Sequence, residues 1–198
     1  MNRRPHPSAA PLCTLLPSFA FGGALLIGLS MSFSAAAEQT LTLARGRLIA
    51  QAPAGWESVE PASMILEGEL SIAPPADSDA DPARLTMMAA GGSIDQNVQR
   101  WIAQFEGSEG GSDLSAADIK TTALADTTTE VTLVDMKGIY LDGPPRGPKT
   151  PRADYRLLGA IVPLAEGRAY FFKLVGPAAT VDPVADDFRA MIASLELR

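Results

Sequence analysis

Two neighbouring segments near the end of the chain are apolar on both faces, and this pattern constrains the fold more than any other. Residues 154–163 and 168–175 are predicted strands, and both place large apolar side chains at consecutive positions. The side chains concerned are Leu157, Leu158, Ile161, Val162, Phe171, Phe172, Leu174 and Val175. A strand with two apolar faces needs cover on both sides. We therefore expect these two strands in the middle of a sheet, joined by a hairpin loop at 163–167.

Shorter strands are predicted earlier in the chain. Leu66, Leu70 and Ile72 alternate with polar residues, which is typical of a strand with one wet face. A solvated loop is expected at 74–82, where proline and aspartate are frequent, and a strand over 85–89 follows it. Two further strands are expected near residues 118–124 and 130–140.

One helix is predicted between the strands at 85–89 and 118–124. Its apolar stripe at helical spacing consists of Ile94, Val98, Trp101, Ile102 and Phe105. Ser93 and Gln96 form a capping-box pattern at its start, and Asp95 lies in the first turn, where the helix dipole favours an acid. Gly107 is expected to end this helix.

A second helix is predicted near the C-terminus. Asp182 is expected to be its N-cap and Pro183 to lie in its first turn. The buried stripe consists of Val184, Phe188, Met191, Ile192 and Leu195. The order of strands, helix, strands and helix indicates an α+β fold, in which a mainly antiparallel sheet is flanked by helices.

The first 37 residues are predicted to be a secretory signal peptide. Arg3 and Arg4 precede an apolar stretch at about 19–33, and the small residues that follow it fit cleavage after Ala37. An uncleaved anchor helix is the alternative, although the apolar stretch is shorter than the ~20 residues that a membrane span needs. We therefore expect one domain at residues 38–198, in the periplasm or secreted, with no membrane insertion after cleavage.

The charge balance bears on the choice of partner. The chain has 16 Lys and Arg residues against 23 Asp and Glu residues, which gives a formal net charge of -7. Loss of Arg3 and Arg4 with the signal peptide makes the remainder more negative still. An acidic surface repels nucleic acids and anionic membranes, so neither is an expected partner.

Histidine and cysteine are absent from residues 38–198, because His6 and Cys13 both lie in the predicted signal peptide. Disulfides are therefore not expected to hold the domain together. The side chains that most often serve as a base near neutral pH, a zinc ligand or a thiolate nucleophile are also missing. We expect no enzymatic activity, no cofactor and no metal. Gly91-Gly92-Ser93 begins like a nucleophile elbow, but Ser93 is better explained as a helix cap.

Acidic residues leave two other interpretations open. A carboxylate-based hydrolase needs two acids at a suitable separation, which the sequence does not define. Asp77, Asp79 and Asp81 alternate like the opening of a calcium loop, but Pro82 and Met88 stand where an EF-hand loop carries Gly and Glu. A solvated acidic loop is the preferred interpretation, and weak calcium binding is the alternative.

A basic segment at residues 143–152 stands out in this acidic chain. It carries Arg146, Lys149 and Arg152 without any acid, and its four prolines favour an extended, exposed loop that loses little entropy on docking. Tyr140 and Tyr155 flank it. We expect these five residues to form a surface that binds a protein partner. The alternative is a long hairpin connection with incidental charge, whose tyrosines pack the strand ends.

One turn and the order of elements resemble a known family. Residues 52–56, Ala-Pro-Ala-Gly-Trp, open a strand as in PsbP-like domains, and the mid-chain helix, antiparallel strands and final Met-Ile-Ala-Ser-Leu follow in the same order. The runs at 84–93 and 155–161 are similar to small exported bacterial proteins of that fold. The resemblance implies an α/β/α sandwich used as a non-catalytic binding or assembly module. The best-known members of the family dock on photosystem II, and a structural cousin binds the nuclear transport GTPase Ran.

No functional residue is transferred by this resemblance, because the histidine-containing ion sites of photosynthetic members have no histidine to match here. The leading hypothesis is a non-catalytic, extracytoplasmic binding or accessory domain that acts through protein contact. A carrier of small molecules or lipids is the alternative, and it requires a sizeable cavity between sheet and helices, beside Trp101 and Phe105. A carboxylate-based hydrolase is the third hypothesis.

Overall fold

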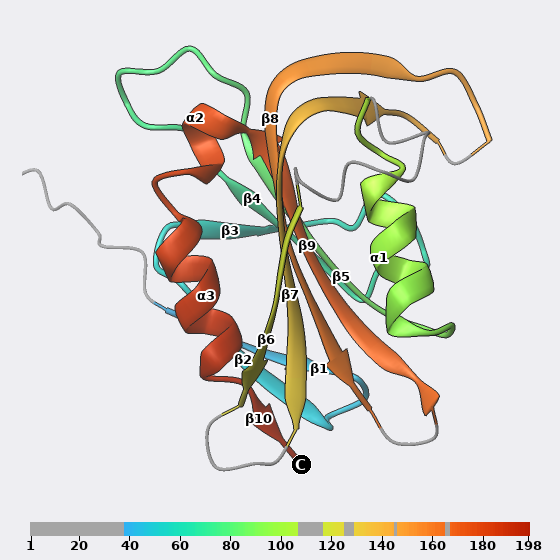
Figure 1. Ribbon diagram of the computed structural model, residues 1–198. Coiled ribbons are helices and arrows are strands. Elements are labelled where there is room, and N and C mark those ends of the chain that lie inside the picture. The colour runs from blue at the N-terminus through green and yellow to red at the C-terminus, as the bar shows by residue number, and fades with distance from the viewer. Residues whose placement is uncertain (1–37, 107–116, 125–128, 145, 165–166) are drawn as a thin grey trace, which may run out of the picture. The chain divides into compact units, whose positions relative to one another are not determined.

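The computed structural model describes residues 38–106, 117–124, 129–144, 146–164 and 167–198, which form two antiparallel sheets and three helices (Figure 1). The larger sheet has seven strands in the order β3-β4-β5-β9-β8-β7-β6. Its strands are β3 (Trp56–Val59), β4 (Gly68–Ile72), β5 (Ala83–Ala90), β6 (Ala117–Ala123), β7 (Glu130–Asp142), β8 (Thr150–Pro163) and β9 (Ala169–Pro177). The smaller sheet contains β1 (Gln39–Leu43), β2 (Leu48–Ala52) and β10 (Glu196–Leu197), with β2 in the middle.

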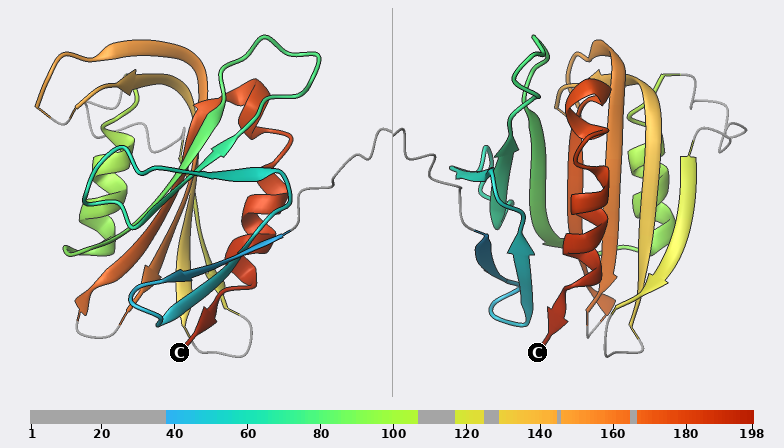
Figure 2. Two further views of the ribbon diagram at one scale, coloured as in Figure 1. Left: turned by 180° about the vertical axis from the view of Figure 1, so that it is seen from behind. Right: turned by 90° about the vertical axis from the view of Figure 1, so that its left-hand side faces the viewer.

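The helices lie on both faces of the larger sheet. Helix α1 (Ile94–Ile102) covers one face, and α2 (Ala178–Val181) and α3 (Ala185–Ala193) cover the other, as the views in Figures 1 and 2 show. The expected fold class, an α+β fold with a mainly antiparallel sheet flanked by helices, is confirmed.

The strands that are apolar on both faces lie at the centre of the sheet, as predicted. On the α3 side, they bury Leu158, Ala160, Val162, Tyr170, Phe172 and Leu174 together with side chains of α3. On the α1 side, they bury Leu157, Ile161 and Phe171 together with side chains of α1. The β8–β9 hairpin expected at 163–167 is also confirmed, because Pro163 pairs with Ala169.

The start of α1 confirms the capping-box prediction. The Ser93 side chain accepts a hydrogen bond from the Gln96 backbone N–H at 3.2 Å, and the Gln96 side chain accepts one from the Ser93 backbone N–H at 3.3 Å. The helix ends at Ile102, earlier than expected, and Phe105 instead forms a β-bridge with Tyr140. Gly107, the expected end, lies outside the described residues.

The predicted start of the last helix is wrong. Asp182 has right-handed helical backbone angles and follows α2 directly, and the N-cap of α3 is Val184, without a side-chain hydrogen bond. The Asp182 carboxylate is used elsewhere, since it accepts hydrogen bonds from Lys137 and Arg156, both at 2.9 Å. Two hydrogen bonds from cationic donors stabilise a carboxylate more than a hydrogen bond from a helix N-terminus does.

The β7–β8 hairpin is longer than the sequence patterns predicted. Strand β8 begins at Thr150 and pairs with β7 as far as Asp142, so Arg152 belongs to a strand and not to the loop. Strand β9 pairs with β8 only from Tyr155 onward. Among the described strands, residues 150–154 therefore pair with β7 alone. A proline such as Pro151 is tolerated at such a sheet edge.

The strands at 39–43 and 48–52 were not predicted. A tight turn joins them, in which Ala44, Arg45 and Gly46 have positive φ angles of 53°, 58° and 83°. The Glu67 carboxylate accepts hydrogen bonds from the backbone N–H groups of Ala44 and Arg45, at 3.1 and 3.4 Å. A distant side chain thus holds this turn, and local sequence patterns do not contain that information.

The position of α1 against the sheet depends on Gly159 in β8. A Cβ atom at this position would collide with the Trp101 ring, which packs directly on the glycine. The ring also meets Phe171 edge to face, with centroids 6.0 Å apart and an interplanar angle of 83°. Glycine at this position therefore sets how closely the helix approaches the central strands.

Gly159→Ala is expected to destabilise the protein by about 1–3 kcal/mol, because the added methyl group displaces Trp101 from a packed core. Urea unfolding, followed by tryptophan fluorescence, measures the change. Gly91→Ala is the matched control, since nothing lies within 4 Å of a Cβ atom there. Equal stability of the two variants would show that α1 does not depend on this contact.

Candidate functional site

A partly open pocket of about 570 Å³ lies between α1, strands β5 and β9, and the β7–β8 hairpin, and we call it the α1 pocket. Its apolar lining consists of Met88, Ala90, Trp101, Ala103 and Phe171. Its polar lining consists of Thr86, Asn97, Arg100, Gln104, Lys149 and Lys173, and Gly143 completes it. Its volume is within the range of about 300–1,000 Å³ that is common for small-molecule sites.

Strand alternation brings the floor of the pocket together. Thr86, Met88 and Ala90 lie at every second position of β5 and therefore face the same side of the sheet. Phe171 and Lys173 follow the same rule in β9. Because β5 and β9 are hydrogen-bonded neighbours, these side chains form one surface beneath α1.

Lys173 is the polar centre of this surface. Its ammonium group donates a hydrogen bond of 2.6 Å to Gln104 Oε1 and one of 3.0 Å to the Tyr140 hydroxyl oxygen. The Tyr140 hydroxyl lies 3.5 Å from the same Gln104 oxygen. The three side chains come from β9, the segment after α1, and β7, so the cluster joins three parts of the fold around the pocket.

The pKa of Lys173 is lowered to about 8, mainly by burial and also by the charges of Arg84 and Lys149, which together outweigh the opposite effect of Asp142. Lys173 is thus a cation near neutral pH that has lost much of its hydration. Burial, together with Asp142, raises the pKa of Tyr140 to about 12, so its hydroxyl stays neutral.

Tyr140 is held in place by aromatic and backbone contacts. Its ring stacks in parallel on Tyr155, with centroids 5.9 Å apart, and meets Phe105 edge to face at 5.6 Å. The Leu141 backbone N–H donates to the Gln104 carbonyl at 2.7 Å. These contacts fix the segment after α1 against the hairpin, whose upper part bends over that end of the helix in Figure 1.

Positive charge reaches the pocket from three elements. Arg100 is on α1, Lys149 is in the hairpin and Lys173 is on β9. Lys149 also donates to the carbonyl oxygens of Gly143 and Pro144, at 2.9 and 2.7 Å, which closes the hairpin. No acidic side chain is found among the described residues that line the pocket. The pocket lining therefore contains no pair of acids for the carboxylate-based hydrolysis considered from the sequence.

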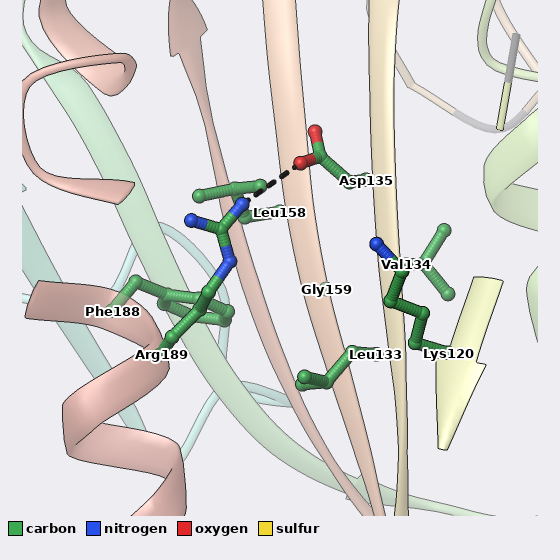
Figure 3. A pocket seen from close by; sticks show the side chains of 8 residues that line it. All are labelled: Lys120, Leu133, Val134, Asp135, Leu158, Gly159, Phe188 and Arg189. Carbon is green, nitrogen blue, oxygen red and sulfur yellow. Dashed lines mark hydrogen bonds and ion pairs between the residues drawn. The ribbon is translucent and has the colours of Figure 1, made fainter. Parts of the chain in front are cut away.

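A second polar cluster lies on the opposite face, against α3. Arg156 binds Asp135 at 2.6 Å and Asp182 at 2.9 Å, and Arg189 binds Asp135 at 3.1 Å. Figure 3 shows the Arg189 guanidinium directed at Asp135, with Leu158 beside it. The cavity at this place is only about 50 Å³, so we interpret the cluster as a structural link between the sheet and α3.

The structure brings together part of the predicted binding surface. Tyr140 and Tyr155 stack on each other, and Lys149 lines the α1 pocket. Arg146 is exposed near the end of the hairpin, and Arg152 lies beside Asp142 with a nitrogen–oxygen distance of 3.8 Å. Neither arginine lines the pocket.

The acidic loop at 74–82 is exposed at Asp77, Asp79 and Asp81. Within the described part of the chain, no group of three or more His, Cys, Asp or Glu side chains could hold a metal ion. The helices described there are too short or too polar to cross a membrane.

The most important pocket residue, Lys173, was not identified from the sequence. It interrupts the apolar run Tyr170-Phe-Phe-Lys-Leu-Val175 in a strand predicted to be buried on both faces. A cation at such a position is the signal that could have identified the site, because buried charges need partners. Gln104 and Arg100 gave no comparable signal, since both follow the ordinary polar pattern of a helix.

A comparison with solved structures finds chains of similar fold. PsbP of the cyanobacterium Synechocystis sp. PCC 6803 is 14% identical, with a TM-score of 0.49, and the match covers 87% of this chain and 99% of that one. A protein of unknown function from Pseudomonas aeruginosa is 11% identical, with a TM-score of 0.43 and coverage of 81% and 97%. The Ran-binding protein Mog1p of Saccharomyces cerevisiae is 9% identical, with a TM-score of 0.46 and coverage of 81% and 95%.

The resemblance to PsbP-like domains stated from the sequence is thus found again, as a likeness of fold. No family model and no curated protein matches the chain. Similarity at this level shows the fold alone and does not identify ligands or partners.

The polar cluster against α3 makes the free energy of unfolding depend on pH. Burial raises the pKa of Asp182, but hydrogen bonds from Lys137 and Arg156 outweigh it, and the net pKa is lowered. A carboxyl group whose pKa is lower in the folded state stabilises the fold at pH values above its unfolded pKa of about 4. This contribution is lost as the pH falls through the pKa of the folded state. Because the Asp182 side chain is 45% exposed and solvent screens its ion pairs, we expect Asp182→Asn to cost only about 0.5 kcal/mol at pH 7 and progressively less below pH ~4.

Urea unfolding at several pH values measures this difference. Asp186→Asn is the control, because that side chain is 97% exposed and contacts only Arg189 among the ion pairs described. A cost of Asp182→Asn that stays constant from pH 7 to pH ~3 would contradict the assignment.

Proposed function

We propose that this protein is a non-catalytic binding domain that holds a small-molecule ligand in the α1 pocket. The observation that carries the proposal is the combination of a pocket of about 570 Å³ with a cluster of polar side chains around Lys173. An apolar pocket with a few convergent polar groups is the usual form of a ligand site. A carrier of small molecules or lipids was the alternative hypothesis from the sequence, and it required a cavity beside Trp101.

The non-catalytic part of the proposal is supported by the sequence, since residues 38–198 contain no histidine and no cysteine. The expected signal peptide at residues 1–37 supports a location outside the cytoplasm. A binding domain in the periplasm or outside the cell would serve as a carrier or as a ligand-dependent accessory protein.

Filling the pocket tests the proposal. Ala90→Phe places a ring on the pocket floor, and we expect it to abolish the binding of small amphipathic fragments that perturb the Trp101 indole signal in NMR spectra. The chain has two tryptophans, and Trp56 belongs to the core on the α3 side, so its indole signal is the internal reference.

Ala193→Phe is the matched control, because Ala193 is exposed on α3 and should leave fragment binding unchanged. Ala103→Phe, at the pocket rim, provides a second variant in case Ala90→Phe disturbs folding. A set of fragments that leaves the Trp101 signal unmoved in the unmodified protein would refute the proposal.

Protein contact through the β7–β8 hairpin is the second candidate function. The observation in its favour is the exposure of Arg146 and Arg152 on a hairpin whose shape is held by Lys149. The charge of Arg152 is only weakly compensated, because its pair with Asp142 is long and exposed.

We expect the double variant Arg146→Ser, Arg152→Ser to keep its melting temperature but to lose a cross-linked partner in intact cells. Arg168→Ser, Arg198→Ser is the matched control, since both arginines are exposed and lie outside the hairpin. Mass spectrometry of the cross-linked material identifies the partner. Equal capture by both double variants would exclude the hairpin as the contact surface.

A further inference from the structure

The charges around the α1 pocket are opposite to those of the whole chain. The formal net charge of the chain is -7, yet Arg100, Lys149 and Lys173 reach the pocket from three different elements. The neighbouring acid Glu69 is bound by Arg84 at 2.7 Å, and Asp142 lies beside Arg152. A locally positive site on an acidic protein attracts anions and discriminates against cations.

The Lys173 ammonium group has an N–H that can donate a hydrogen bond to such an anion. An ammonium group carries three hydrogens, and among the described residues two of them are directed at Gln104 and Tyr140. The third remains for a ligand in the pocket. Because Gln104 and Tyr140 already fix the ammonium group, a ligand does not have to order it, which lowers the cost of binding.

The pocket surface beside Lys173 is apolar. Phe171, Met88 and Ala90 lie on the same floor as Lys173, and Trp101 of α1 meets Phe171 edge to face above it. A ligand that fits both the ammonium group and this apolar surface has one anionic group and one apolar body. An inorganic anion would leave the apolar surface uncovered, and a neutral apolar molecule would leave the Lys173 donor without a partner.

We infer that the ligand of the α1 pocket is a small organic acid, whose carboxylate binds Lys173 and whose aromatic or aliphatic body packs on Trp101 and Phe171. This inference rests on the proposed function, since it names the chemical class of the ligand in that same site. No covalent step is involved, and the carboxylate becomes the third hydrogen-bond partner of the ammonium group.

A pair of probes that differ only in charge tests the inference. Naphthalene-2-carboxylate and its neutral analogue naphthalene-2-carboxamide are titrated separately into the full chain, with the Trp101 indole signal as the reporter and that of Trp56 as the reference. We expect the carboxylate to bind about 10- to 100-fold more tightly, because it forms an ion pair with the ammonium group, whereas the carboxamide oxygen accepts a hydrogen bond from it without a negative charge.

Lys173→Met should bring the two affinities together, and Arg100→Gln should reduce their ratio by a smaller factor. Arg198→Gln is the charge-matched control, because Arg198 is an exposed residue in the C-terminal segment beyond β10, and it should leave the ratio unchanged. Met is chosen because it keeps the apolar length of lysine and removes only the ammonium group.

The possible results distinguish the organic-acid inference from the pocket proposal. Equal affinities in the unmodified protein, with a shifted Trp101 signal, would overturn the organic-acid inference and leave the pocket proposal standing. A ratio that survives Lys173→Met would also overturn the inference, because the carboxylate would then bind elsewhere. If neither probe moves the Trp101 signal up to its solubility limit, both the inference and the proposed function are wrong.

Discussion

The burial of β8 and β9 on both faces is the constraint on which the rest of the structure depends. Two central strands with apolar residues on each side require a layer above and a layer below. On one side, α2, α3 and the core shared with β2 provide that cover. On the other side the cover is α1, whose nine residues span about 14 Å. Strand β8 alone has 14 residues, so one short helix leaves part of this face open.

The uncovered part of the face is where the α1 pocket lies. The β7–β8 hairpin bends toward it, and the Lys173–Gln104–Tyr140 cluster joins the hairpin, the sheet and the segment after α1. A desolvated cation costs free energy that an apolar side chain at the same position would not. Departures of this kind from the local pattern are expected at functional sites, so a buried lysine in an apolar strand indicates a site at Lys173.

Much of the fold could be predicted from patterns within single segments. The central strands, their hairpin and the Ser93 capping box depend on residues that are close in sequence, and all were confirmed. Asp182 was misassigned because its partners Lys137 and Arg156 are far away in the chain. The sequence indicated the pocket only as a cavity beside Trp101 and Phe105, required by the carrier hypothesis, and it assigned Tyr140 and Lys149 to a protein-contact surface. Lys173 was not identified, because its partner Gln104 is far away in the chain.

The most direct test of the central claim is to locate a bound organic acid by intermolecular nuclear Overhauser effects. With naphthalene-2-carboxylate in slow or intermediate exchange, the account predicts contacts from the naphthalene protons to the Trp101 ring and the Met88 methyl group. Contacts to Phe188 and Met191, in the core on the α3 side, would contradict it. So would contacts confined to the exposed Met64 and Ile65, because they would indicate nonspecific adsorption.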